Sequence, residues 1–351
     1  MLEILKHYKI DFSDGVIQTF GTGLINHTWI VNKRKERFIL QRVNKSVFTN
    51  PYDIAHNIDS LSAFFCKHCP EYRFVSPVPA TNGRSLIEYN GGYYRLFPFV
   101  PGSCTVDVVS TPAQAYEAAV QFGRFTKLLS TFEAKLLRKS IPDFHNLSLR
   151  YKHFLAALEN GNAQRIRESS VLIDFLKNQS NIVSMYEQII YDENFRIRVT
   201  HHDTKISNVL FDQEGNGLCV IDLDTVMAGY FISDVGDMMR TYLCPVSEEE
   251  SDYSKIEVRD EFYYAIVSGY LAEMKDVMTP KEISSFFYAG LFMIYMQAIR
   301  FLTDHLLGDP YYGAKYDGHN FVRANNQVVL LQKLLQKKAS LEDPMNVIMY
   351  T

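Results

Sequence analysis

The sequence has few cysteines and no excess of basic charge. Its five cysteines are an odd number scattered along 351 residues, which suits a reducing compartment better than a disulfide framework. The formal net charge is -4 and the pI is near 6.2, and no run of lysine or arginine offers a local field for a phosphate backbone. We therefore expect no nucleic-acid partner.

The sequence also lacks a secretory signal and a long apolar run. The opening MLEILKHYKIDFSDG has no basic region followed by an apolar one. The longest apolar stretch, FFYAGLFMIYMQAI from Phe286, ends at Arg300 and is shorter than the ~20 residues that a bilayer requires. We expect a cytoplasmic protein with no membrane partner, in which this stretch forms a buried helix; the oligomeric state is left open.

The two parts of the chain differ in their patterns. Runs such as VIQTF, HTWIVN, RFILQRV, LIEY and YYRLFPF are rich in β-branched and aromatic residues and predict antiparallel strands. Residues 51–68 lack strand alternation and predict one helix. After residue 100 the pattern becomes helical, beginning with Thr111 as a cap and Pro112 at the first helical position. The expected fold is α+β, with a small sheet and one helix in residues 1–100 and a mainly helical part in residues 101–351.

One short segment, VTHHDTKISNVLFDQEGNGLCVIDLDT at residues 199–225, interrupts the helical part. Residues 209–211 and 218–221 are apolar strand segments joined by a turn rich in Asp, Asn and Gly, which predicts a hairpin. Folding the chain there brings Asn208 opposite Asp222, with Asp224 close by. These oxygen ligands are incomplete alone, as in Mg²⁺ sites where phosphate oxygens and water supply the rest. The hairpin therefore predicts magnesium and a nucleotide.

Two side chains before the hairpin suit phosphoryl transfer. Asp203 lies in the loop five residues before Asn208 and can accept a proton from an attacking hydroxyl. Lys205 can neutralise charge on the transferred group. We expect both to be catalytic.

The segment resembles known kinases. His201-x-Asp203-x-Lys205-x-x-Asn208 is similar to the protein-kinase catalytic loop, and HxDxxxxN followed by IDxD, Gly229 and Asp234 is similar to the aminoglycoside phosphotransferase and choline kinase family. The stretches RVTHHDTKISNVLFD, VIDLDTVMAG, IPDFH and RFLTDHLLGDPYY resemble the N-acetylhexosamine 1-kinase branch of that family. The resemblance implies a two-lobed protein-kinase-like fold. It also implies ATP- and Mg²⁺-dependent transfer of the γ-phosphate to a sugar, at O1 of N-acetylglucosamine or N-acetylgalactosamine.

The resemblance extends to nucleotide-binding positions. FGTGLINHTWIV corresponds to the loop that covers the phosphates, and Phe97–Gly102 to the hinge that holds adenine. The third strand offers Gln41 where a lysine is expected, with Arg42 adjacent, and strand alternation allows only one of them to face the phosphates. The candidate nucleotide-binding residues are Gly21, Gly23, Asn26, Gln41, Arg42, Phe99 and Val100.

Substrate recognition is assigned mainly to the helical part. Aromatic faces can stack on the C–H surface of a sugar, and charged groups can bind its hydroxyls. The candidate substrate residues are His27, Phe144, His145, Arg300, Asp304, Tyr311 and Tyr312.

Several interpretations compete with a sugar kinase. The same chemistry could act on choline, an amino alcohol or an aminoglycoside. A metal-dependent phosphohydrolase would use His201, His202 and Asp203 as ligands, and the missing lysine would suit a nucleotide-binding pseudokinase. We expect His201 to have a structural role and Asp234 to cap its helix or brace the loop. Asp224 is expected either to provide a second contact to the metal or to form a salt bridge with a nearby base.

Overall fold

The computed structural model describes residues 2–12, 15–21 and 25–342, and the chain divides into two compact units. The first unit comprises Met1–Cys104, Thr131–Pro142 and Leu210–Ala228, and the second comprises Thr105–Ser130, Asp143–Val209 and Gly229–Thr351. The boundary predicted after residue 100 lies close to Cys104, where the chain first passes from the first unit to the second. The sequence did not predict that Thr131–Pro142 and Leu210–Ala228 belong to the first unit, because long-range contacts determine this assignment.

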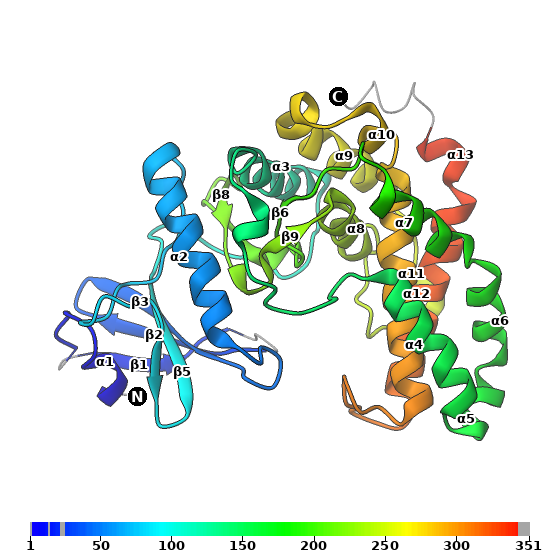
Figure 1. Ribbon diagram of the computed structural model, residues 1–351, viewed down its shortest axis with the longest axis horizontal. Coiled ribbons are helices and arrows are strands. Elements are labelled where there is room, and N and C mark those ends of the chain that lie inside the picture. The colour runs from blue at the N-terminus through cyan, green and yellow to red at the C-terminus, as the bar shows by residue number, and fades with distance from the viewer. Residues whose placement is uncertain (1, 13–14, 22–24, 343–351) are drawn as a thin grey trace. The chain divides into compact units, whose positions relative to one another are not determined.

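An antiparallel sheet forms the body of the first unit, with strand order β1-β2-β3-β5-β4. Each predicted strand is present (Figure 1). Between β4 and β5, Asn90 and Gly91 have φ of 48° and 71°, values that suit a tight hairpin turn. The strands are β1 (Val16–Thr19), β2 (His27–Lys33), β3 (Glu36–Val43), β4 (Ile87–Tyr89) and β5 (Gly92–Pro98).

The helix α2 spans Pro51–His68, the range that the sequence predicts. Proline at its start suits the first helical turn, where an amide donor is not required. Ile54, Ile58 and Leu61 recur at helical spacing and are buried. A separate core cluster joins the short helix α1 (Leu2–Leu5) to Val31, Leu40 and Leu96 of the sheet.

The late segment of the first unit contains the predicted hairpin. Strands β7 (Val209–Phe211) and β8 (Gly217–Val220) pair with each other, a 3-10 turn follows at Leu223–Thr225, and β9 covers Met227–Gly229. The amide of Asn57 in α2 donates to the carbonyls of Val226, at 3.0 Å, and Arg138, at 2.8 Å. One buried side chain therefore joins all three segments of the first unit.

Helices form most of the second unit, as the sequence predicts, and the short strand β6 (Arg198–Thr200) leads into the loop of interest. Thr111 accepts a hydrogen bond from the Gln114 amide and caps α3, with Pro112 in its first turn. The helices are α3 (Pro112–Leu128), α4 (Leu147–Asn160), α5 (Ala163–Glu168), α6 (Ser170–Asn178), α7 (Asn181–Tyr191), α8 (Phe231–Tyr242), α9 (Asp260–Met274), α10 (Pro280–Ile283), α11 (Phe286–Leu307), α12 (His319–Gln336) and α13 (Lys338–Leu341).

The apolar helix α11 forms the core of the second unit. It continues past Arg300 to Leu307, so it is longer than the apolar stretch suggested. Its length and hydropathy would suffice for a membrane span, yet 89% of its apolar window is buried. Helices α4, α8 and α12 pack against it (Figure 1). The prediction of a buried helix is confirmed.

Candidate active site

The loop that follows β6 carries the candidate catalytic residues, and its backbone turns sharply at His202, where φ is 65°. Gly229 lies against this turn, because a Cβ there would lie 2.5 Å from Nε2 of His202 and 2.7 Å from Oγ1 of Thr200. Any other residue at this position would displace the side chains of His202 and Thr200. The close packing explains the glycine of the motif.

The expected brace by Asp234 is present at the start of α8. Its two carboxylate oxygens accept the backbone N–H groups of His201, at 2.9 Å, and His202, at 2.7 Å. The ring of His201 is fully buried and packs edge-on against Phe122, with ring centroids 5.1 Å apart. His201 and Asp234 therefore have structural roles in the loop. Burial is the main cause that raises the pKa of Asp234 to about 7.

A second carboxylate on α8 holds the loop, and our sequence reasoning missed it. Oδ2 of Asp237 accepts the backbone N–H of Thr204 at 2.8 Å, while Arg240 pairs with Oδ1 of Asp237 at 3.0 Å. The hydroxyl of Tyr242 donates to the carbonyl of Thr204 at 2.5 Å. Asp234 and Asp237 are three residues apart, and this spacing places both on one helical face. That spacing is the signal by which the sequence could have indicated Asp237.

Asp203 occupies the centre of this braced loop, and a quarter of its side chain is exposed. Burial alone would raise its pKa, but the charges of Lys205 and His201 and the hydrogen bonds from Lys205 and Asn208 outweigh it and hold the pKa below the usual value. The Lys205 ammonium lies 3.0 Å from Oδ2 of Asp203. Asp203 is therefore an ionised, accessible proton acceptor near neutral pH.

Asn208 lies directly before β7 and is 3% exposed. Its amide nitrogen donates to the carbonyl of Asp203 at 2.8 Å, so its amide oxygen is the atom that could bind a cation. Asp222 follows β8 and has a left-handed backbone, with φ of 58°. Among the residues that the structure describes, no three His, Cys, Asp or Glu side chains form a self-sufficient metal site. Amide and carboxylate oxygens are ligand types that Mg²⁺ takes together with phosphate oxygens and water.

Asp224 has the second of the roles expected for it, that of an ion-pair partner. Its Oδ1 lies 2.5 Å from Nη1 of Arg95, with both side chains 3% exposed. Its Oδ2 accepts the Asn26 amide at 2.7 Å. Both carboxylate oxygens are thus engaged by side chains of the first unit, and the contact with a metal that was also assigned to Asp224 has no support from this geometry.

The structure separates Gln41 from Arg42. Gln41 lies opposite Arg95 on β5, and its Oε1 accepts Nε of Arg95 at 3.1 Å. Arg42 lies opposite Tyr94 on the other face, where it is exposed and 6.0 Å from the ring centroid. Gln41 therefore contacts the arginine that pairs with Asp224, whereas Arg42 lies on the opposite face of the sheet.

The other candidate nucleotide residues lie in the first unit. Gly21 has φ of 76°, which suits a turn, whereas Gly23 is outside the described residues. The backbone N–H of Phe99 donates to Arg37, whose guanidinium covers the Phe99 ring at 3.8 Å. The carbonyl of Val100 accepts the Ser103 hydroxyl. Their contact with adenine stays a prediction.

Aromatic and cationic side chains from distant parts of the sequence meet in the second unit. The rings of Phe144 and His145 stack with centroids 4.4 Å apart. The guanidinium of Arg300 lies 5.6 Å from Phe144, 5.9 Å from Tyr311 and 5.5 Å from Tyr312, measured to the ring centroids. Five of the seven candidate substrate residues thus form one cluster, which we call the aromatic–arginine cluster: Phe144, His145, Arg300, Tyr311 and Tyr312.

The remaining two candidate substrate residues lie elsewhere. Asp304 is buried, and its oxygens accept the backbone N–H groups of Tyr311, at 2.8 Å, and Tyr312, at 2.9 Å. Asp304 therefore shapes the loop that carries the two tyrosines. His27 belongs to β2 of the first unit, where it is exposed and stacks on Trp29. Its contact with a substrate stays a prediction.

The aromatic–arginine cluster carries positive charge. Arg150 is half-buried beside it and donates to the carbonyls of Asp143 and Phe144. Burial first, and then the charge of Arg300, lower the pKa of Arg150. Within the described part of the chain, neither arginine forms an ion pair with a carboxylate. The cluster therefore disfavours a cationic ligand.

Comparisons with known proteins identify the family and the fold of this chain. Residues 16–276 match the model of the phosphotransferase enzyme family. An aminoglycoside phosphotransferase from Alicyclobacillus acidocaldarius has a similar structure, with TM-score 0.64, 14% identity and coverage of 99% of this chain and 96% of that chain. A microcompartment-associated aminopropanol kinase has TM-score 0.63 and 16% identity, covering 97% of each chain. A spectinomycin phosphotransferase in complex with ADP and spectinomycin has TM-score 0.56 and 14% identity, covering 99% of this chain and 95% of that one. These structures share the fold with this chain.

Proposed function

The chain belongs to the phosphotransferase enzyme family, and we propose that it transfers the γ-phosphate of ATP to O1 of an N-acetylhexosamine. The observation that carries the proposal is Asp203, an accessible carboxylate that is held ionised on a loop braced by Asp234 and Asp237. As the sugar O1 bonds to the γ-phosphorus, the bond from that phosphorus to the bridging oxygen breaks and ADP leaves. Asp203 takes the proton from O1, and Lys205 offsets charge on the transferred phosphoryl group.

Asn208 and Asp222 would hold a magnesium ion. Asn208 offers its amide oxygen and Asp222 its carboxylate from the two ends of the hairpin. When bound with ATP, Mg²⁺ neutralises the negative charge of the β- and γ-phosphate oxygens. A neighbouring structure crystallised with ADP supports a nucleotide ligand.

The acceptor is proposed from the aromatic–arginine cluster. Phe144 and Tyr311 offer ring faces for the C–H surface of a sugar, and Arg300 offers donors for ring hydroxyls or an acetamido oxygen. An anomeric hydroxyl is more acidic than an ordinary sugar alcohol, so Asp203 can serve as base although its pKa is low. The unpaired charges of Arg150 and Arg300 disfavour choline, amino alcohols and aminoglycosides, which are cations.

The other two interpretations have less support. A phosphohydrolase would need His201 and His202 as metal ligands, but His201 is buried against Phe122 and Nδ1 of His202 lies 3.1 Å from the carbonyl of Thr200. A pseudokinase would not need the ionised Asp203 or the buried Asn208. The reducing conditions expected from five free cysteines support a cytoplasmic location, which we also propose.

Matched acceptors test the proposal. ADP formation is measured with Mg²⁺, ATP and N-acetylglucosamine, its 1-deoxy analogue, its methyl glycoside or glucosamine, at a pH where the glucosamine amine is charged. We expect turnover of N-acetylglucosamine and none of its 1-deoxy analogue or methyl glycoside. Glucosamine should be lower by about tenfold or more in kcat/KM because its ammonium meets the two arginines.

Each analogue tests a separate part of the proposal. Turnover of the methyl glycoside would show that a hydroxyl other than O1 is attacked. Efficient turnover of glucosamine or of an added amino alcohol would contradict the neutral-sugar assignment.

A further inference from the structure

A buried arginine on β5 lies next to the proposed metal-binding end of the hairpin. Arg95 contacts Asp224 at 2.5 Å and Gln41 at 3.1 Å. Its partner Asp224 lies two residues after Asp222, in the same 3-10 turn that Asp222 caps. An interaction that fixes Asp224 therefore also restricts Asp222.

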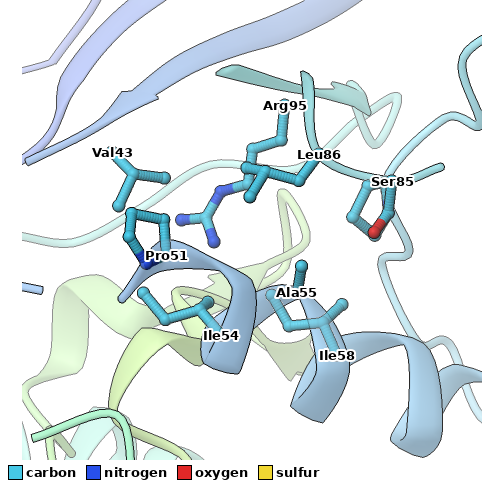
Figure 2. Close-up of a pocket in the computed structure, with 9 residues that line it drawn as sticks. Val43, Pro51, Ile54, Ala55, Ile58, Ser85, Leu86 and Arg95 are labelled. Carbon is cyan, nitrogen blue, oxygen red and sulfur yellow. The ribbon is translucent and has the colours of Figure 1, made fainter. Parts of the chain in front are cut away.

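The apolar surroundings of Arg95 make its charge costly to bury without a partner. Its side chain lines a cavity of about 10 Å³ together with Val43, Pro51, Ile54 and Leu86, which are apolar (Figure 2). A guanidinium at 3% exposure in such surroundings is costly unless a carboxylate and further polar groups meet it. Arg95 and Asp224 therefore require each other.

Polar contacts connect the pair to the loop before β2. Asn26 donates to Asp224 and accepts the backbone N–H of Asn44 at 3.0 Å. Arg95 thus joins β5 to the 3-10 turn, and Asn26 joins the same turn to β2 and to the chain after β3. The carboxylate of Asp224 lies where these contacts converge.

We propose that Arg95 is a positioning residue for magnesium binding. It acts through Asp224, whose anchored carboxylate keeps the turn in the conformation that presents Asp222 with φ of 58°. The ion pair supplies the cation that β3 lacks on this face, where Gln41 is present. The inference rests on the proposed function, because it assigns Asp222 to Mg²⁺.

The test uses variants that separate positioning from folding. Removing the charge of only one partner leaves the other charge buried and can unfold the unit. The main variant therefore removes both charges, Arg95→Met with Asp224→Asn. A second variant, Arg95→Lys, keeps the charge but loses the planar fork of donors. Arg198→Met with Glu282→Gln is the matched control, because Arg198 and Glu282 also form a buried pair, at 2.5 Å, in the second unit.

Binding of a non-hydrolysable ATP analogue is measured by calorimetry, with Mg²⁺ and with EDTA, beside thermal unfolding. We expect the double variant to fold and to lose about tenfold or more in Mg²⁺-dependent affinity, as for other groups that orient a metal ligand. Arg95→Lys should lose less, and no variant should change binding in EDTA. Arg198→Met with Glu282→Gln should lower the unfolding temperature and leave both affinities unchanged.

The outcomes distinguish the inference from the proposed function. If the double variant and Arg95→Lys both bind the Mg²⁺ complex as tightly as the wild type, or lose affinity equally in EDTA, Arg95 does not position a metal ligand. If the wild type binds the Mg²⁺ complex but phosphorylates no sugar, only the proposed acceptor is wrong. If the wild type binds no nucleotide at all, the proposed function and the inference are both wrong.

Discussion

Asp203 and Lys205 are the two residues that carry the proposed chemistry. The loop places a carboxylate in a mostly buried position, where burial opposes its charge, and then places an ammonium 3.0 Å away. The net effect is a pKa below the usual value of a carboxyl group. A base that stays ionised suits an acceptor hydroxyl that is itself acidic, such as a sugar O1.

Lys205→Met should move the acid limb of the kcat profile to higher pH. The substitution removes the foremost of the groups that lower the pKa of Asp203, while burial continues to raise it. Since the ionised form is the active one, the ratio of kcat at pH 5 to kcat at pH 8 should fall relative to wild type. Initial rates between pH 4.5 and 9 give this ratio.

Lys205→Arg keeps the charge and should retain the wild-type profile. Lys177→Met, an exposed change on α6, should leave the profile unaltered. An unchanged limb in Lys205→Met would show that Lys205 does not set the ionisation of the base.

Residue types at characteristic spacing could be predicted, and residues defined by tertiary contacts could not. Asp203, Asn208 and Asp222 stand at local positions around one hairpin, so the sequence contains their arrangement. Arg95 is 129 residues before Asp224, and nothing in either local pattern indicates their ion pair. A single sequence therefore indicates the chemistry better than the residues that support it.

At the scale of elements, α8 is the brace of the catalytic loop. Its first turns present Asp234 and Asp237 to three backbone N–H groups, those of His201, His202 and Thr204. Carboxylates at the start of a helix also interact favourably with its dipole. The buried helix α8 thus holds the loop after β6, which has little regular structure of its own.

Asp234→Asn should change how the free energy of unfolding depends on pH. The pKa of Asp234 is raised from 3.8 to about 7, mainly by burial, so the folded protein holds a proton between these values that the unfolded chain has released. Its contribution to the free energy of unfolding is therefore full below about pH 4 and is lost as the pH rises through about 7. The stability of wild type relative to Asp234→Asn should fall by roughly 2–3 kcal/mol between pH 5 and pH 8.

Urea unfolding at several pH values measures this difference. Asp174→Asn, an exposed change on α6, is measured beside it as the control. A relative stability of wild type that rises from pH 5 to pH 8 would contradict the buried, proton-holding state of Asp234.

The elements themselves were largely predictable, for different reasons. Strand alternation predicts β2 and β3, and the range of α2 follows from its proline start and its lack of alternation. The end of α11 was harder, because Arg300 interrupts the apolar run while the helix continues to Leu307 and ends at Gly308 with φ of 91°. A charged residue with partners, as Arg300 has in Phe144 and Gln297, does not end a helix, and composition alone cannot show those partners.

At the scale of the whole molecule, the chain enters the first unit again at Leu210 and leaves it after Ala228. Asp203 and Asn208 thus belong to one compact unit, while Asp222 and Asp224 belong to the other. The sequence boundary after residue 100 could not show this division, because it depends on contacts such as Asn57 with Val226. The fold class was predictable, since its two patterns of periodicity are continuous over long stretches.

Asp203 is the base of the proposed sugar kinase, and single-turnover phosphate transfer by Asp203→Asn measures its contribution. Labelled ATP, Mg²⁺ and N-acetylglucosamine are mixed with wild type, Asp203→Asn or the control Asp174→Asn, and sugar phosphate is quantified beside nucleotide affinity. We expect Asp203→Asn to transfer phosphate about a hundredfold or more slowly, with unchanged affinity for Mg²⁺ and nucleotide, and the control to match wild type. A variant that keeps most of the wild-type rate would contradict this role of Asp203.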